Sequence, residues 1–241
     1  MTYLPSRPGH RGWFSAALIA AIAGSSAGCG LISSDVVDFE LNLPKKQFSI
    51  DTAGWQVDPV AADLLLQTSC ASVPSVCNTA AQSACEMNCS GTCAADQFCE
   101  LQLDVSLYQP VNLLAEAPEL KSIDDQPVIK VTVDSMTYDI EVNTLDVATP
   151  ELTLYVAPMS VMSPTDAQAL AIGTIPPVPA GETIRGRVVE FTPDGKARLA
   201  SIMSTFKTPF NVLVGSSLTV TGELPTGKLD AVVSIRGRAG L

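Results

Sequence analysis

Histidine is almost absent from this 241-residue chain, whose single histidine is His10. Without a second imidazole there can be no His-x-x-x-His zinc helix and no two-histidine iron site. Residues 11–241 contain no histidine, so they also lack the imidazole that a Ser-His-Asp or Cys-His catalytic arrangement needs. An enzyme made from these residues would have to use carboxylate, lysine or tyrosine chemistry.

Carboxylates are plentiful, but their spacing does not indicate a site. They lie in expected loops or at alternate positions of strand-like runs, where solvated outer faces explain them: Asp124, Asp125, Asp134, Asp139 and Glu141. The close spacing of aspartates that forms a calcium loop is missing. The sequence therefore predicts a protein that is not an enzyme and that has no cofactor and no metal site.

Basic residues are scarce as well. The chain has 14 Lys and Arg against 25 Asp and Glu, a formal net charge of −11. A surface of this sign repels nucleic acid, and it also disfavours adsorption to anionic lipid through a polybasic patch. We expect no nucleic-acid partner, and any membrane attachment must come from another source.

The first 28 residues have the three parts of an export signal. Arg7 and Arg11 give a basic start, residues 13–23 form an apolar core, and small residues follow. The apolar core is shorter than the ~20 residues that span a bilayer. Removal of residues 1–28 leaves 12 basic and 25 acidic residues, a formal charge of −13, in residues 29–241. We expect these to form a single β-rich domain.

The run from Ser26 to Gly30, with Cys29 at its fourth position, resembles the lipobox of bacterial lipoproteins. The resemblance implies that Cys29 is acylated on sulfur and becomes the new N-terminus. Gly30, which is not aspartate, implies sorting to the outer membrane, on either its periplasmic or its surface face. The chain departs from the pattern at Ser26, where lipoproteins usually have a large aliphatic residue, so cleavage by an ordinary signal peptidase is the alternative.

Six more cysteines lie within residues 70–99, in a segment with few large aliphatic residues: Cys70, Cys77, Cys85, Cys89, Cys93 and Cys99. In an exported chain they predict three disulfides that staple a small insertion. Six cysteines allow fifteen connectivities, and a structural metal is the rival interpretation. Asn78 predicts a helix through residues 80–89, which would place Cys85 and Cys89 on one face, bonded to different partners.

The rest of the sequence predicts strands. Alternating apolar residues between turn signals indicate about eight of them, at 37–43, 101–107, 128–133, 138–142, 152–156, 184–191, 210–220 and 229–235. Cap and proline signals or helical spacing indicate three short helices, at 60–67, 165–172 and 195–206. We expect a mostly β fold: an antiparallel β-sandwich or curved sheet, with two or three short helices and a disulfide-rich insertion.

A second resemblance covers about thirty residues. The strand, Val142-Asn143-Thr144-Leu145 and the next strand together resemble the late-embryogenesis-abundant β-sandwich family, where an Asn-Pro-Leu-like step joins two strands. Thr144 stands where that family has proline. The resemblance implies a small antiparallel sandwich near a membrane and no catalysis.

Three short features have two interpretations each. Ser204-Thr205-Phe206-Lys207 resembles the Ser-x-x-Lys signature of penicillin-recognising enzymes, but Phe206 also fits as the last core residue of the helix at 195–206. Trp55 follows an expected turn, where it is either exposed or packed at a strand end. Residues 175–179 are rich in proline and fit a recognition segment or a stiff connector.

Two functions remain for a lipid-anchored envelope protein. The first is a structural or partner-interaction role at the outer membrane, through a sandwich edge or the disulfide insertion. The alternative is a carrier that encloses a lipid or another hydrophobic ligand between apolar strands. In both cases acyl chains would supply the contact with the membrane.

Overall fold

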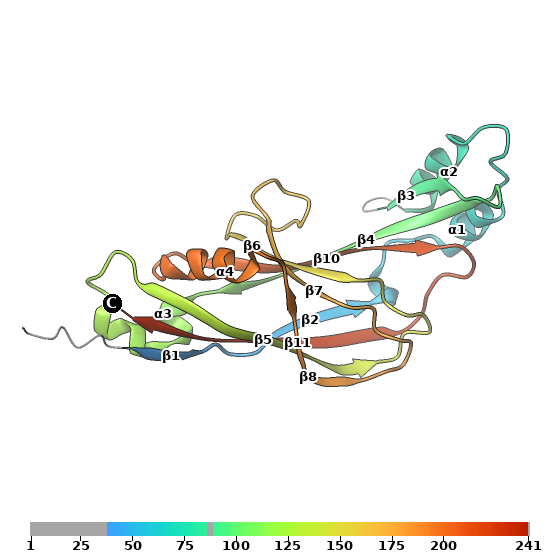
Figure 1. Ribbon diagram of the computed structural model, residues 1–241. Helices are drawn as coiled ribbons and strands as arrows, with labels where there is room; N and C mark the ends of the chain where they lie inside the picture. The colour runs from blue at the N-terminus through green and yellow to red at the C-terminus, as the bar shows by residue number, and fades with distance from the viewer. Residues whose placement is uncertain (1–37, 86–88, 241) are drawn as a thin grey trace, which may run out of the picture. The chain divides into compact units, whose positions relative to one another are not determined.

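The computed structural model describes residues 38–85 and 89–240, which belong to one compact unit (Figure 1). The unit is mostly β, and its strands form two sheets in which every pairing is antiparallel. The fold class predicted from the sequence is confirmed, including short helices and a disulfide-rich region at residues 70–99.

The first sheet is built around β11, which pairs with three of the other strands. Its strands are β1 (Phe39–Asn42), β2 (Lys46–Asp51), β11 (Lys228–Gly240), β5 (Lys130–Asn143) and β8 (Ile184–Val188). β1 and β2 both pair with the same edge of β11, β1 near its end and β2 near its start. β5 pairs with the other edge of β11, and β8 follows β5.

The second sheet has six strands in the order β3-β4-β10-β6-β7-β9. Their bounds are β3 (Cys89–Cys93), β4 (Cys99–Val111), β10 (Phe210–Val220), β6 (Leu152–Pro158), β7 (Leu170–Ile175) and β9 (Glu190–Phe191). The apolar alternation at 101–107 and 210–220 therefore does mark strands, and β10 pairs along its whole length with residues 101–111 of β4.

One side of the sandwich is closed by a strand that changes sheet. β8 lies at the edge of the first sheet and β9 at the edge of the second, and only Val189 separates them along the chain. Val189 is 2% exposed, and its N–H donates to the Met136 carbonyl. On the opposite side, β2 and the second half of β4 are the neighbouring edges of the two sheets.

Short helices lie at the connections between strands. They are α1 (Pro59–Leu66), α2 (Val76–Ala84), α3 (Leu113–Glu116) and α4 (Gly195–Ser204), with 3-10 turns at Thr52–Gly54 and Pro118–Ile123. The sequence signals for α1 hold: Asp58 accepts hydrogen bonds from the N–H groups of Val60 and Ala61, and Pro59 is the first helical residue.

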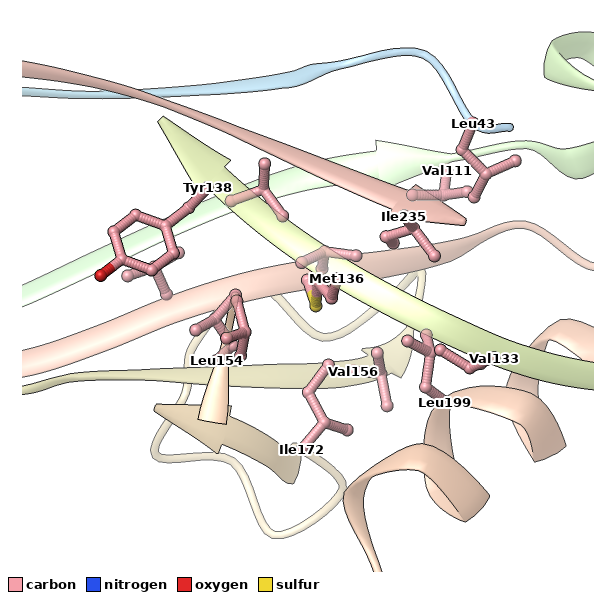
Figure 2. Close-up of a cluster of buried hydrophobic side chains, with 14 of the residues drawn as sticks. Leu43, Val111, Val133, Met136, Tyr138, Leu154, Val156, Ile172, Leu199 and Ile235 are labelled. Carbon is pink, nitrogen blue, oxygen red and sulfur yellow. The ribbon is translucent and has the colours of Figure 1, made fainter. Parts of the chain in front are cut away.

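The main core lies between the two sheets. Met136 of β5, Leu154 of β6 and Ile172 of β7 are each 0% exposed, and Leu199 of α4 is likewise fully buried (Figure 2). Phe206 follows α4 and is 1% exposed, as expected for the last core residue of this segment. Burial of each such side chain contributes about 1.5–3 kcal/mol, which makes this cluster the main source of stability.

The helix predicted at 165–172 is wrong. Residues after Ser163 form turns, in which Asp166 accepts from the N–H of Gln168, and β7 then begins at Leu170. β7 pairs with β6 from Leu152 to Val156, and Ile172 faces the core. A serine-proline cap is a local signal, and here tertiary strand pairing overrides it.

Several strand boundaries also differ. The strands expected at 128–133 and 138–142 are one strand, β5, which begins at Lys130, because pairing with β11 continues across a bulge. The strand expected at 184–191 is divided into β8 and β9 at the change of sheet. β2 and β3 were not predicted, since the short run Lys46–Asp51 has few apolar residues and β3 is made of small ones.

Candidate interaction surface

The predicted signal, residues 1–28, and the predicted lipidation site, Cys29, lie outside the described residues. Their assignment stays a prediction from the sequence. Of the described residues, no helix is long and apolar enough to cross a membrane.

The six cysteines of residues 70–99 form three disulfides. The pairs are Cys70–Cys93, Cys77–Cys99 and Cys85–Cys89. Cys85 and Cys89 therefore bond to each other, and the expectation of different partners for them is wrong. The helix expected at 80–89 also differs: α2 begins at Val76 and ends at Ala84, so Cys85 is extended backbone and can turn toward Cys89.

Two of the disulfides fix a hairpin to its surroundings. Cys93 of β3 and Cys99 of β4 lie opposite each other across the hairpin. They do not form a disulfide with each other. Cys93 is bonded to Cys70 in the preceding loop, and Cys99 is bonded to Cys77 in α2. The hairpin is thus held to the loop and to α2 by covalent bonds as well as by backbone pairing.

The same sulfur atoms form the one group of potential metal ligands found among residues 38–85 and 89–240. The sulfurs of Cys70, Cys77 and Cys99 all lie within 4.8 Å of one another. Each of them is already bonded to a cysteine sulfur, and a metal requires free thiolates. The disulfide interpretation of this segment therefore accounts for the cluster.

The disulfides belong to a second, smaller core. Its fully buried members include Ala62 and Leu65 of α1, Cys70 and Cys77, and Leu101 of β4. We call residues 58–85 and 89–103 the stapled subdomain, since α1 and the start of β4 pack into it. Trp55 is partly buried and contacts both this core and the main one, so it packs at their junction instead of standing free in the turn.

Exposed apolar side chains gather on the stapled subdomain. Val60 and Leu64 of α1 are 69% and 65% exposed, Val73 is 56% exposed and Phe98 is 46% exposed. Val60 and Leu64 are four residues apart and share one helix face. Phe98 forms a bridge with Ser69, just after α1, so it lies near the end of this helix.

The charge of this region has one sign. No lysine or arginine occurs from Gln47 to Leu120, whereas Asp58, Asp63 and Asp96 carry acidic charge in the stapled subdomain. All three of these aspartates are exposed. The region therefore combines exposed apolar side chains with exposed acidic ones. The missing basic residues were visible in the sequence and could have marked this surface.

The stapled subdomain and β1 lie at opposite ends of the paired strands (Figure 1). β4 begins at the stapled subdomain, where Leu101 pairs with Val220, and ends where Val111 pairs with Phe210. Lys46, at the start of β2, donates to the Pro110 carbonyl at 2.8 Å and therefore lies near this second end. β1 precedes β2 and pairs with the last residues of β11, still farther from the stapled subdomain.

The Ser-x-x-Lys string does not bring its two groups together. The Ser204 hydroxyl donates to the Ser201 carbonyl at 2.7 Å. The Lys207 ammonium group lies 5.8 Å from the centroid of the Phe206 ring. The serine hydroxyl is thus used in the last turn of α4, and the lysine lies over an aromatic face.

The proline-rich loop is fixed at one residue. Val178 is fully buried, and its N–H and carbonyl both bond to Thr149. Pro176, Pro177 and Pro179 are exposed around it. Asn143, in the Asn-Thr-Leu step, donates to the carbonyls of Pro179 and Glu182 at 3.0 Å each. The loop is therefore a rigid connector, and its prolines are the part left to solvent.

The carboxylate residues of β5 are engaged in surface interactions. Asp139 accepts from the Gly186 N–H and from Lys45, and these bonds hold the pKa of its carboxyl below the ordinary range. Asp134 pairs with Arg238 at 2.9 Å, which raises the pKa of the arginine. Asp124 and Asp125 are exposed after the 3-10 turn. Their structural environments match the solvated faces expected from the sequence.

The apolar hollow next to Trp55 leaves little space for a hydrophobic ligand, and the two larger hollows that border Trp55, of about 190 Å³ and 480 Å³, have linings that are at least half polar. The apolar hollow, lined by Ile50, Trp55, Leu145 and Leu152, has a volume of about 20 Å³. This volume holds about one water molecule, whereas ligand pockets have about 300–1,000 Å³.

Comparison with known proteins gave no matching family model and no matching curated protein.

Proposed function

We propose that this chain is an outer-membrane lipoprotein without enzymatic activity, anchored by acyl chains on Cys29, and that it binds a protein partner through the stapled subdomain. The signal-like residues 1–28 and the lipobox-like run support the anchor. Three disulfides support an oxidising compartment outside the cytoplasm.

The observation that carries the partner role is the exposure of Val60, Leu64 and Phe98 on the stapled subdomain. Single exposed apolar residues are ordinary on protein surfaces, but several together on one small unit are typical of an interaction site. The second core and the disulfides hold α1 in place, so the surface loses little conformational freedom on binding. These features favour a preformed docking surface.

Charge indicates the chemistry of the partner. Asp58, Asp63 and Asp96 are exposed in the same subdomain as the apolar side chains, and the subdomain has no lysine or arginine. A surface with an apolar centre and a basic rim would complement it, and such pairs associate faster at low ionic strength. We therefore expect a partner that is basic where it meets α1, and binding that weakens as salt is added.

The carrier role remains the competing function. It requires an enclosed apolar cavity, and the hollow beside Trp55 has only about 20 Å³. The inward positions of the sheets are instead occupied by buried side chains such as Met136 and Leu154, which fill the space between the layers (Figure 2). This packing favours the partner role.

A photo-reactive amino acid at position 64 tests the docking surface. In cells that produce the chain, it should give a crosslinked protein adduct that decreases with added salt. The control position is Val188, which is 59% exposed but lies on β8 of the first sheet. Equal adducts from both positions, or none from position 64, would contradict docking at α1.

The anchor has its own test. Cys29→Ser should abolish acylation and release the chain from the membrane fraction, while the disulfides and the β-sheet content stay unchanged. A chain that remains unacylated with Cys29 present, or that begins at another residue, would instead support cleavage by an ordinary signal peptidase.

A further inference from the structure

The second sheet has an outer face as well as the face that packs on the main core. Val214 of β10 and Leu154 of β6 belong to the core, and side chains alternate along a strand, so Gly215 and Thr153 face outward. Cross-strand pairing places Ser106 of β4 and Thr153 of β6 on either side of Gly215. Because Gly215 has no side chain, the sheet has a depression between two hydroxyl groups at this point.

The loop that connects β6 to β7, residues 159–169, forms a wall of this depression (Figure 1). A Cβ atom at Gly215 would lie 2.7 Å from the Cβ of Pro164 in this loop and 3.3 Å from Cε2 of Tyr155. Asn211 of β10 is 1% exposed, and its side-chain amide donates to two carbonyls of the loop, at 3.1 and 2.8 Å. The wall is therefore held on the sheet by buried hydrogen bonds.

The loop and the three strands enclose a groove of about 530 Å³. Ligand pockets have volumes of about 300–1,000 Å³. Tyr155 and Pro164 supply apolar surface to the lining. The polar side chains of the lining are hydroxyl groups and carboxylates, and they include those of Asp104, Ser106, Glu151, Thr153 and Ser217. The groove thus combines an aromatic wall with a floor of hydroxyl groups.

The charge of the groove disfavours anionic ligands. Asp104 and Glu151 both line it and are exposed, and none of the described residues that line it is a lysine or an arginine. A phosphate or carboxylate group would meet like charge here without a basic partner, which discriminates against such ligands. The groove therefore suits a ligand without negative charge.

The floor of the groove has few free backbone groups for an extended peptide. Gly215 pairs with Ser106 on one side and with Thr153 on the other, and Thr153 pairs in turn with Thr174 of β7. Strand addition needs an unpaired edge. A ligand in this groove would therefore be recognised by side chains.

The side chains of the groove complement a ligand that is rich in hydroxyl groups. Serine and threonine hydroxyls both donate and accept hydrogen bonds, whereas ionised carboxylates only accept them. A hydrogen bond from a hydroxyl group to a carboxylate is about twice as strong as one between neutral groups. A sugar offers many hydroxyl groups at its edges and C–H groups on its faces, and the C–H groups can lie on an aromatic ring.

We infer that the groove between the outer face of β4, β10 and β6 and the loop at residues 159–169 binds a neutral carbohydrate. The carboxylates of Asp104 and Glu151 accept from its hydroxyl groups, and Tyr155 and Pro164 carry its apolar face. Because much of the lining is exposed, a bound sugar exchanges with solvent and is removed by dialysis. This site does not depend on the anchor or on the docking surface at α1.

The test compares neutral and charged disaccharides on the exported chain with Cys29→Ser. The neutral probes are cellobiose, maltose and N,N′-diacetylchitobiose, and the charged ones are cellobiouronic acid, an anion, and chitobiose, a cation. A neutral probe should shift the amide NMR signals of Gly215 and Thr153, and it should bind at least tenfold more tightly than cellobiouronic acid. Chitobiose should bind no more tightly than its diacetylated form.

Two pairs of variants locate the sugar. Ser217→Tyr fills the groove and should weaken binding at least tenfold, whereas Thr219→Tyr lies on the same exposed face of β10 outside the groove and should leave binding unchanged. Tyrosine suits both strand positions. Glu151→Gln should weaken the neutral sugar at least threefold and strengthen binding of cellobiouronic acid. Glu223→Gln, at an exposed position outside the groove, should do neither.

Three results would overturn the inference. The first is failure of every neutral probe to bind, and the second is tighter binding of chitobiose, which would assign the groove to amines. The third is an equal loss of binding in Ser217→Tyr and Thr219→Tyr, or NMR shifts confined to other parts of the chain, which would place the sugar elsewhere.

Discussion

Gly91 of β3 packs directly against the carbonyl of Cys77 in α2. A Cβ atom at position 91 would overlap this carbonyl oxygen, and it would also lie 3.1 Å from the Cβ of Ala81. The contact lets the β3–β4 hairpin lie against α2 closely enough for the Cys77–Cys99 disulfide to form. The absence of a side chain at Gly91 thus helps to position the surface at which we propose that a partner binds.

Gly91→Ala should therefore destabilise the stapled subdomain. Overpacking of a buried contact costs about 1–3 kcal/mol, because backbone atoms of α2 would have to move. The measurement is chemical unfolding, with hydrogen exchange to show that the loss of protection is confined to α2 and β3. Gly54→Ala is the matched control, since nothing lies within 4 Å of a Cβ there. Equal stability of both variants would show that the contact at Gly91 is loose.

The three disulfides should contribute unequally to stability. Cys77 and Cys99 are separated by 22 positions along the chain, and Cys85 and Cys89 by 4. A longer closed loop removes more entropy from the unfolded chain, so alanine at both Cys77 and Cys99 should cost about 3 kcal/mol. The same change at Cys85 and Cys89 should cost about 2 kcal/mol. A larger loss of unfolding free energy for the Cys85 and Cys89 variant than for the Cys77 and Cys99 variant, measured with denaturant, would contradict this account.

Asp139 should make stability depend on pH in the acid range. The Gly186 N–H, and secondarily Lys45, hold the pKa of its carboxyl below the ordinary value. A lowered carboxyl pKa in the folded state stabilises the fold above the unfolded-state pKa of about 3.9, and this contribution is lost as the pH falls through the folded-state pKa. Asp139→Asn should thus lower the free energy of unfolding by about 1 kcal/mol at pH 7.

The difference between Asp139→Asn and the unaltered chain should begin to decrease as the pH falls toward about 3.9, the unfolded-state pKa, and should disappear only below the lowered folded-state pKa, where both side chains are neutral. Urea unfolding at several pH values measures it. Asp124→Asn, at an exposed position, should change the free energy of unfolding by less than about 0.5 kcal/mol throughout. A difference that persists at low pH would show that the carboxylate charge is unimportant at Asp139.

Asn143 should be important for the connection between β7 and β8. It is 7% exposed, donates to the carbonyls of Pro179 and Glu182, and accepts from the Leu145 N–H. Asn143→Ala would leave these groups without their partner and should cost about 2 kcal/mol. Asn42→Ala, at an exposed position of β1, should have little effect on the melting temperature. If the two variants have the same melting temperature, water replaces the hydrogen bonds of Asn143.

Much of the fold could be predicted from local patterns, and the parts that could not depend on contacts distant in sequence. Leu101 and Leu103 alternate with polar residues as a half-buried strand requires, and they are buried in β4. At 163–172 the cap signal was equally clear, but pairing with β6 determines the conformation. The connectivity of the cysteines is set by the packing of α2 on β3, which no spacing along the chain reveals.

The candidate docking surface was only partly visible in the sequence. Val60 and Leu64 look like core residues of a short helix, and the structure is needed to show that Ala62 and Leu65 face the core instead. The stretch without basic residues was the available signal, but charge patterning alone does not locate a surface.

The most direct test of a docking function against a carrier function is mass spectrometry of residues 30–241, exported without the lipid and compared under native and denaturing conditions. The account predicts the same mass in both conditions, with a deficit of about six hydrogens for three disulfides. Extra mass of small-molecule size that disappears on denaturation would identify a bound ligand and contradict the docking account. A full complement of free thiols would contradict the stapled subdomain on which that account depends.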